Sequence, residues 1–229
     1  MSVNAPYNHR VTAHGLGGSH RLILAEVRDG ARVLDVGCAT GYLAAELSAR
    51  GCRVVGIEPD PASAAQAERS CEHVVVGSFE SSEDRAQIPG TFDFVIFGDV
   101  LEHLVDPWEA LRAAHGLLSP GGVAVVSVPN VAAWPVRLGL LAGSFRYTDF
   151  GLLDRTHVRF FTRATAHELV EGAGFALERE RLVHLEREPG RVRRALPLAS
   201  SIVDRALARL LPGLFAQQFV MRLRPQGRS

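Results

Sequence analysis

The strongest constraint on the fold is the regular alternation of short apolar runs with segments of helical pattern. The runs are rich in β-branched residues, as buried strands are, and the segments between them have helical spacing. This order predicts five parallel strands joined by helical crossovers, which is an α/β fold. We expect strands at 32–37 (RVLDVG), 53–58 (RVVGIE), 73–77 (HVVVG), 92–98 (FDFVIFG) and 123–128 (VAVVSV), and helices at 40–50, 61–70, 107–118 and 163–173.

The helix at 107–118 has the most clearly marked boundaries. Asp106 is a suitable N-cap, and Pro107 occupies the first helical position, where proline is favoured. A turn is predicted at 119–122 (SPGG), and its two glycines mark the end of the helix. Because the pattern is unbroken over 229 residues, we expect a single domain over residues 1–229.

The charge of the chain limits its partners. Lys plus Arg (25) equals Asp plus Glu (25), so there is no overall basic field for a phosphate backbone, and we expect no nucleic-acid partner. The C-terminal end is nevertheless basic, which favours an anionic surface or partner there. Its arginines are Arg187, Arg191, Arg193, Arg194, Arg205, Arg209, Arg222, Arg224 and Arg228.

The cysteines and the apolar stretches bear on location. Cys38, Cys52 and Cys71 have neither the spacing of a disulfide framework nor that of a zinc site, so a cytoplasmic location is expected. The N-terminal residues MSVNAPYNHR form no apolar secretory segment. The longest apolar stretch, 121–141, is interrupted by prolines and an arginine, so we expect no stable membrane insertion.

Two segments break the alternating pattern. Residues 131–162 are rich in aromatic side chains, and long connections of this kind are usually lids or binding segments, so we expect an acceptor-binding insertion. Residues 185–216 lie between probable strands at 176–184 and 219–223 and carry an apolar helical stripe. We expect this helical insertion to pack on the sheet or on a second copy, as in a homodimer, rather than to lie on a membrane.

The segment 33–42 (VLDVGCATGY) predicts a strand, a glycine-bracketed turn and the start of a helix. Glycines let a ligand approach the backbone, and a helix N-terminus offers free N–H groups. A dinucleotide site would look similar, but the G-x-G-x-x-G pattern is absent. Asp35 suits a ligand that carries an ammonium and a sulfonium, whereas it would repel a pyrophosphate. The segment therefore favours S-adenosylmethionine over NAD.

Glu58 supplies a second acidic group within the same βαβ unit. It ends the second strand about twenty residues past the first glycine, where an acidic side chain of a Rossmann-like fold accepts ribose hydroxyls. Taken singly, Asp35 could be a turn cap and Glu58 a solvated strand end. Their common register in one unit favours the cofactor roles.

Four segments of the chain resemble the class I S-adenosylmethionine-dependent methyltransferases. They are VLDVGCATG, VVGIEPD, FDFVIFGDVLEHLVDP and LLSPGGVAVVSVPN, in the family's order and spacing, over about residues 31–130. The resemblance implies a Rossmann-like fold: a seven-stranded, mostly parallel sheet whose last strand is antiparallel, with helices on both faces. Residues 30–130 would then form the cofactor-binding core.

The resemblance also implies positions for the cofactor contacts. One departure is that the aspartate often found after the third strand is replaced here by 77–80 (GSFE), so a serine hydroxyl, Glu80 or a backbone group must accept the adenine amino group. The expected contacts are Asp35, Gly37, Cys38, Ala39, Gly41 and Tyr42 around the methionine end, Glu58 with Pro59 at the ribose, Ser78 and Phe79 at the adenine, Asp99 and Val100 near the sulfonium, and His20 near the cofactor carboxylate.

Three further segments resemble a subgroup of bacterial methyltransferases often involved in sugar, polysaccharide or natural-product biosynthesis. They are 17–20 (GGSH) ahead of a first helix, 134–141 (WPVRLGLL) and 147–162 (YTDFGLLDRTHVRFFT). The aromatic side chains among them either wall an acceptor pocket or form plain core. The expected acceptor contacts are Trp134, Phe145, Tyr147, Asp154 and Arg155.

Methyl transfer from a sulfonium is an in-line displacement, and a hydroxyl acceptor must also lose a proton, which a neutral histidine can take. The candidates are His103, on the turn after the fourth strand, and His157, in the aromatic segment. His103 could instead be a packing residue, and His157 could be a structural residue bonded to Asp154. Asp149, Asp154 and His157 match no metal-ligand spacing, so we expect no metal.

The sequence thus predicts O-methylation of a small-molecule natural product or sugar-containing acceptor, with S-adenosyl-L-methionine as donor and S-adenosyl-L-homocysteine as product. Transfer to nitrogen or carbon is the alternative within the same enzyme class. A non-catalytic S-adenosylmethionine-binding regulatory module is the alternative from another class, because no residue is identified with certainty as the base.

Overall fold

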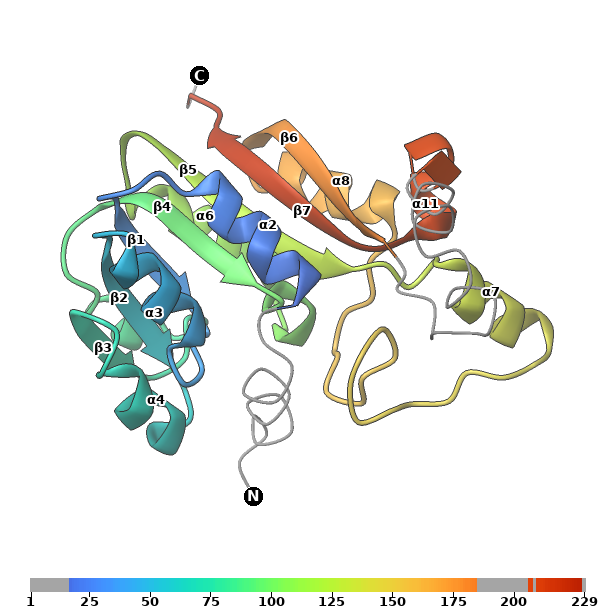
Figure 1. The fold of residues 1–229 in the computed structure, drawn as a ribbon, viewed down its shortest axis with the longest axis horizontal. Helices are drawn as coiled ribbons and strands as arrows, with labels where there is room; N and C mark the ends of the chain where they lie inside the picture. Colours follow the sequence, from blue (N-terminus) through green and yellow to red (C-terminus); the bar gives the residue numbers. More distant parts are fainter. Residues whose placement is uncertain (1–16, 185–205, 208, 228–229) are drawn as a thin grey trace.

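The computed structural model describes residues 17–184, 206, 207 and 209–227, and its centre is one seven-stranded sheet (Figure 1). The strand order is β3-β2-β1-β4-β5-β7-β6. Strands β1 to β5 are parallel neighbours, and β7 is antiparallel to both β5 and β6, as predicted. The strands are β1 (Arg32–Val36), β2 (Arg53–Glu58), β3 (His73–Val76), β4 (Phe92–Gly98), β5 (Leu118–Pro129), β6 (Phe175–His184) and β7 (Ala216–Pro225).

Helices cover both faces of the sheet (Figure 1). Their starts follow from local capping chemistry: Asp106 accepts a hydrogen bond from the Glu109 N–H at the start of α6, and Pro107 is its first residue, as expected. The helices are α2 (Gly18–Glu26), α3 (Tyr42–Ala49), α4 (Pro61–Ala67), α5 (Ser82–Arg85), α6 (Pro107–His115), α7 (Trp134–Leu141), α8 (Arg163–Gly172), α11 (Pro212–Phe215) and the 3-10 turn η1 (Leu101–His103).

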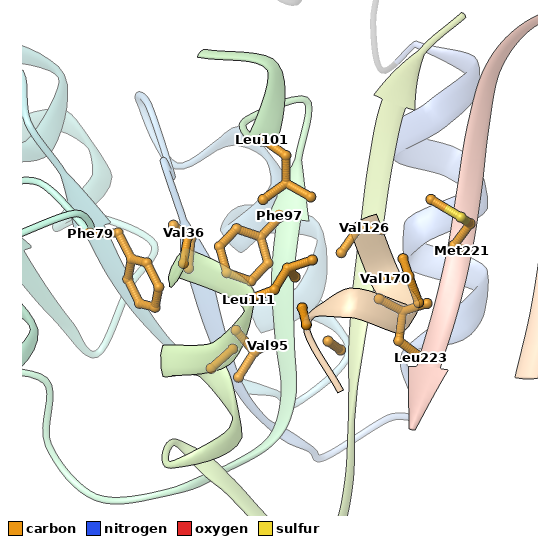
Figure 2. Packing of buried hydrophobic residues seen from close by; sticks show 14 of the residues in the cluster. Val36, Phe79, Val95, Phe97, Leu101, Leu111, Val126, Val170, Met221 and Leu223 are labelled. Atoms are coloured by element: carbon orange, nitrogen blue, oxygen red, sulfur yellow. The ribbon is translucent and has the colours of Figure 1, made fainter. Parts of the chain in front are cut away.

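Two apolar layers hold the helices on the sheet. Successive side chains of β4 point to opposite faces, so Val95 and Phe97 join the layer under α6 and α8, while Phe94 and Ile96 join the layer under α2 and α3. Figure 2 shows the first layer, in which Leu111 of α6 packs near Phe97. Its buried members come from both ends of the chain, which makes the sheet one cooperative core.

Ion pairs fasten the C-terminal strands to α2. The Glu26 carboxylate is buried at the end of α2 and pairs with Arg179, Arg181 and Arg222. Glu178 accepts hydrogen bonds from Arg222 and Arg224. The described part of the predicted basic C-terminal end is therefore partly neutralised within the fold. Arg187, Arg191, Arg193, Arg194, Arg205 and Arg228 lie outside the described residues.

Several expected boundaries were wrong. Helix α6 ends at His115, where Gly116 takes the C-cap, and the SPGG turn lies within β5. The pairing of β4 with β5 jumps from Phe92↔Leu118 to Phe94↔Val123, so the extra residues of β5 form a bulge. In the sequence pattern such a bulge resembles a turn. Helix α2 already begins at Gly18, within the GGSH segment expected ahead of it.

The two predicted insertions have different outcomes. Residues 134–141 form helix α7, so the aromatic segment is not all loop. The insertion expected at 185–216 lies largely outside the described residues, which show α11 within it. Within the described ranges, the longest helices fall short of the length and apolarity that a membrane crossing requires.

Asn130 joins the end of β5 to the start of β7. It is fully buried; its Nδ2 donates to the Ala216 carbonyl at 2.8 Å and to the Gly213 carbonyl at 3.2 Å, and its Oδ1 accepts from the Ala132 N–H at 3.0 Å. Asn130→Ala would leave buried backbone groups without partners, so we expect the free energy of unfolding to fall by about 2–3 kcal/mol. Urea denaturation measures this. The exposed amide variant Gln66→Ala should lose less than about 0.5 kcal/mol, and equal losses in the two variants would contradict the assignment.

Candidate active site

The loop from β1 to α3 has a left-handed backbone at three positions. The φ angles are +68° at Gly37, +48° at Ala39 and +78° at Gly41. A side chain at Gly41 would place its Cβ 2.8 Å from the Ala67 Cα, and one at Gly37 would meet Val100 at 2.8 Å. Gly41 therefore permits close packing of α3 on α4, a reason for glycine that is additional to ligand access.

Asp35 lies at the end of β1 on the face of α2 and α3. Its side chain is buried, and its Oδ2 makes no hydrogen bond to any described residue. Burial, together with the nearby Glu58 carboxylate, raises the pKa of Asp35 to about 7. Asp35 is thus a buried carboxyl group without a positive partner among the described side chains.

Glu58, at the end of β2, holds the loop in place. Its Oε2 accepts a hydrogen bond from the Ala39 N–H at 2.9 Å, and its Oε1 accepts one from the Asp60 N–H at 3.0 Å across Pro59. The residue is 1% exposed, so the alternative interpretation of Glu58 as a solvated strand end does not hold. Contact with a ribose remains a prediction for Glu58 and Pro59.

Cys38 is buried in the same loop. Gly56 leaves room for its sulfur, because a Cβ there would lie 2.5 Å from the Cys38 Sγ. A hydrogen bond with Cys71 and burial raise the pKa of Cys38 above its ordinary value, so the group stays a thiol. Its position in the loop agrees with a cofactor role through the backbone rather than through the sulfur.

Asp99 follows β4 with a φ of +58°, which is unusual for a residue other than glycine. Its carboxylate accepts hydrogen bonds from Ser127, Gln218 and Ser19. Its N–H donates to the Ser127 Oγ at 2.9 Å. Donors from α2, β5 and β7 thus fix this turn, and sequence reasoning had not identified Ser127 and Gln218.

His20 of α2 meets Tyr42 of α3 beside this turn. The Tyr42 hydroxyl lies 3.2 Å from the His20 Nε2, and the rings meet edge to face at 5.0 Å. Burial lowers the pKa of His20, although the Asp99 carboxylate opposes this shift. Burial also raises the pKa of Tyr42 well above its ordinary value, so we expect both groups to be neutral near pH 7.

The turn after β3 is built differently from the expectation. Asp84 of α5 places its Oδ2 2.9 Å from the Ser78 N–H and occupies the space where a Cβ of Gly77 would lie. Glu80 faces away from this turn and accepts hydrogen bonds from the Val105 and Asp106 N–H groups. The turn after β3 has no aspartate of its own at 77–80, but the carboxylate of Asp84, seven residues after Gly77, reaches it.

Phe79, expected at the adenine, is buried in the core. Its ring meets that of Phe97 edge to face at 5.4 Å, and the Arg85 guanidinium lies over its ring. Phe79 thus anchors the turn after β3 to the apolar layer shown in Figure 2.

The aromatic segment docks on the turn that follows β4. The Glu102 carbonyl accepts hydrogen bonds from the N–H groups of Val158 and Arg159, both at 2.9 Å. The rings of His103 and His157 meet edge to face at 4.9 Å, so the fold brings the two predicted catalytic histidines together. The His157 Nδ1 makes no hydrogen bond to any described residue, so the bond to Asp154 that we considered is not formed by this atom, although the Asp154 charge opposes the lowering of the His157 pKa by burial.

Burial and the neighbouring His103 lower the pKa of His157. Glu102 is buried beside the two rings, and burial together with the Asp99 charge raises its pKa well above the ordinary value. In the described part of the chain, the group of side chains with ligand atoms close enough for a metal ion is Glu102, His103 and His157, all within 4.8 Å of one another. The set Asp149, Asp154 and His157 considered from sequence is not among such groups.

The predicted acceptor residues lie in three places. Phe145 and Tyr147 meet at 5.7 Å and both pack against Phe160, which lies beside His157, so these aromatic rings form one cluster. Asp154 accepts hydrogen bonds from Thr156, and Arg155 pairs with Asp149 at 2.6 Å on the exposed side of the segment. Trp134 begins helix α7.

A family model described as a methyltransferase domain matches residues 7–180. The chain is a class I S-adenosylmethionine-dependent methyltransferase. It is 31% identical over 160 residues to a ubiquinone biosynthesis O-methyltransferase of Chromobacterium violaceum, a match that covers 65% of this chain and 66% of the relative.

Solved structures of low identity share the fold. A methyltransferase from Thermotoga maritima, described as a possible histamine N-methyltransferase, has a TM-score of 0.64 at 18% identity, over 96% of this chain and 95% of that one. Magnesium protoporphyrin IX methyltransferase from Synechocystis, solved with bound S-adenosylhomocysteine, has a TM-score of 0.59 at 15% identity, over 91% and 80%.

The residues present fit the cofactor of this family, S-adenosylmethionine. Asp35 has a buried oxygen without a partner for an ammonium, and no described side chain caps the N-terminus of α3. Asp35, Glu58 and Asp99 together make the site acidic, which suits a cationic ligand. Bound there, the cofactor supplies an electrophilic methyl group on a sulfonium.

The raised pKa of Asp35 makes the stability of the cofactor-free methyltransferase depend on pH. Because the folded-state pKa of about 7 exceeds the ordinary pKa of 3.8, the protonated carboxyl stabilises the fold at low pH, and this contribution is lost as the pH rises through about 7. Between about pH 5 and pH 8, we expect the wild type to lose about 2–3 kcal/mol relative to Asp35→Asn. Urea denaturation of both proteins tests this, and parallel pH profiles would contradict the shift.

Proposed function

We propose that this methyltransferase transfers the methyl group of S-adenosylmethionine to a hydroxyl oxygen of a small organic acceptor. The observation that carries the proposal is the histidine pair His103 and His157, which joins the aromatic cluster to the turn that bears Asp99. The curated relative from Chromobacterium violaceum, whose name gives it as an O-methyltransferase, supports oxygen as the accepting atom. It is matched over 66% of its length.

Asp99 links the cofactor half of the site to the acceptor half. Its charge acts on His20 and Tyr42 on one side, and on Glu102 and His157 on the other. A methyl group held near Asp99 would therefore lie between the loop of β1 and the histidine pair. Orientation of acceptor and donor in this way supplies most of the acceleration of an in-line displacement.

The proposed cofactor contacts follow the predicted set with one addition. Asp35 would hold the ammonium, the loop at 37–42 the methionine end, and Glu58 the ribose. The neutral His20 and Tyr42 would flank the carboxylate. We add Asp84 at the adenine, because its carboxylate lies against Gly77 and accepts a hydrogen bond from the Ser78 N–H in the turn after β3.

The aromatic cluster favours a flat acceptor. Phe145 and Tyr147 are partly exposed, at 37% and 56%, although both rings pack against Phe160. Aromatic faces that remain open to solvent can stack on a ring of the acceptor, such as a phenol or the aromatic part of a natural product. Within the proposal, a sugar-containing acceptor is the second choice, because the described cluster offers it few polar partners.

A panel of acceptors tests the proposal. Purified enzyme with isotopically labelled cofactor is offered phenols and catechols, sugar nucleotides, and amines of similar size, and the product is analysed for the atom that carries the label. We expect label on oxygen of a ring hydroxyl. Transfer to nitrogen or carbon with no O-methyl product would overturn the proposal.

Loss of His157 should impair transfer rather than cofactor binding, because its ring contacts the acceptor cluster and not the loop of β1. We expect His157→Ala to lower kcat by about 10²-fold or more, with a Kd for S-adenosylhomocysteine within a few-fold of the wild type. The exposed His73 on β3 provides the control His73→Ala, which should change neither value. Full activity of both His157→Ala and His103→Ala would refute the catalytic assignment.

A further inference from the structure

Glu102 places a carboxyl group in the protein interior without an evident partner. Its side chain is 1% exposed, its Oε2 makes no hydrogen bond to any described residue, and none of the described arginines pairs with it. Burial of an unpaired carboxyl group costs several kcal/mol unless the environment compensates it. A fold that keeps an unpartnered carboxyl oxygen beside two imidazoles points to a ligand bound between these three side chains.

His103 is oriented to offer its Nε2 atom. Its Nδ1 lies 3.2 Å from both the carbonyl oxygen and the hydroxyl of Thr156. Because a carbonyl can only accept, Nδ1 carries the proton, and Nε2 retains its lone pair. Asp154 fixes this arrangement, since its Oδ1 accepts hydrogen bonds from the Thr156 N–H and hydroxyl.

His157 is oriented in the complementary way. Its Nδ1 is buried and has no hydrogen-bond partner among the described residues. The His103 ring is thus held by Nδ1 on a backbone carbonyl, which leaves its Nε2 for a ligand, and the buried Nδ1 of His157 is left without a described partner. Histidines that bind metals show this pattern, in which the second nitrogen donates to a carbonyl or carboxylate.

We propose that Glu102, His103 and His157 bind one divalent transition-metal cation of the zinc type, with an open coordination position toward the acceptor. One carboxylate and two imidazoles are a common ligand set for catalytic zinc and related cations. The three ligand atoms lie within 4.8 Å of one another, so all fit within about 2.8 Å of a common centre. Metal bonds of about 2.0–2.2 Å need only a small inward movement of each side chain.

The role of the cation rests on the proposed O-methylation. A hydroxyl oxygen bound at the open position loses its proton to solvent water more readily, because the cation stabilises the oxyanion. The oxygen then forms its bond to the methyl carbon as the carbon–sulfur bond breaks, and the electron pair of that bond stays on sulfur. The two histidines thereby act on the acceptor as ligands, which replaces the metal-free site expected from sequence.

The test measures cation binding directly. The full chain is stripped with a chelator and titrated with Zn²⁺ by calorimetry and with Co²⁺ by visible absorption, which reports nitrogen and oxygen ligands. We expect one cation per chain, with affinity at least about 100-fold lower in Glu102→Gln and His157→Gln. Glu102→Gln keeps the shape of the side chain and replaces a buried carboxyl by a neutral amide, so this variant should fold.

Matched variants control for other binding groups. The exposed His73→Gln and the thiol variant Cys71→Ser should bind Zn²⁺ as the wild type does. Absence of binding, or binding that survives in both Glu102→Gln and His157→Gln, overturns the inference. Methylation of a hydroxyl at full rate after chelation overturns it too and leaves the proposed function standing. One bound cation with no O-methyl product from any acceptor would refute the proposed function while the cation site stands.

Discussion

The burial of carboxyl groups at one edge of an apolar sheet is the constraint on which the site depends. Asp35, Glu58 and Asp99 each lie at or just after the carboxyl end of a parallel strand, so they come to the same edge of the sheet, around the point between β1 and β4 where the strand order reverses. Each is accommodated differently. Backbone N–H groups satisfy Glu58 and side-chain donors satisfy Asp99, whereas the Asp35 Oδ2 has no described partner. The edge therefore has a negative potential that a cationic ligand relieves.

Repulsion between the Asp35 and Glu58 carboxylates affects the ionisation of the site. The Glu58 charge helps to raise the pKa of Asp35, so ionisation of Asp35 is unfavourable in the cofactor-free fold. A positive group bound beside Asp35 would favour its ionised form. The same physics recurs on the other side of Asp99, where Glu102 is buried beside two imidazoles. Asp35 and Glu102, each with a buried oxygen that has no described partner, thus lie on either side of the Asp99 turn. Hydrogen bonds from three different elements maintain the strained φ of Asp99.

The sequence predicted the parts of the fold that depend on local pattern. Strand β4 alternates between two apolar layers, and Asp106 with Pro107 sets the start of α6, so both could be identified from neighbouring residues. Asp84 could not, because it fills the turn after β3 from a short helix later in the chain. Glu102 was also missed, since a glutamate in a polar-looking turn carries no local sign that tertiary packing will bury it.

Main-chain hydrogen bonds hold the aromatic segment on the turn after β4. The Glu102 carbonyl holds Val158 and Arg159 by their backbone N–H groups, and such bonds do not depend on the side chains involved. His157 is therefore positioned next to His103 by the main chain, while the rings of Phe145 and Tyr147 pack against Phe160, which in turn contacts His157. Under the proposed function, substitutions among the exposed aromatic residues would change which acceptor fits without moving the histidine pair. The chemistry would then stay fixed on the β4 turn, and the segment that covers it would select the acceptor.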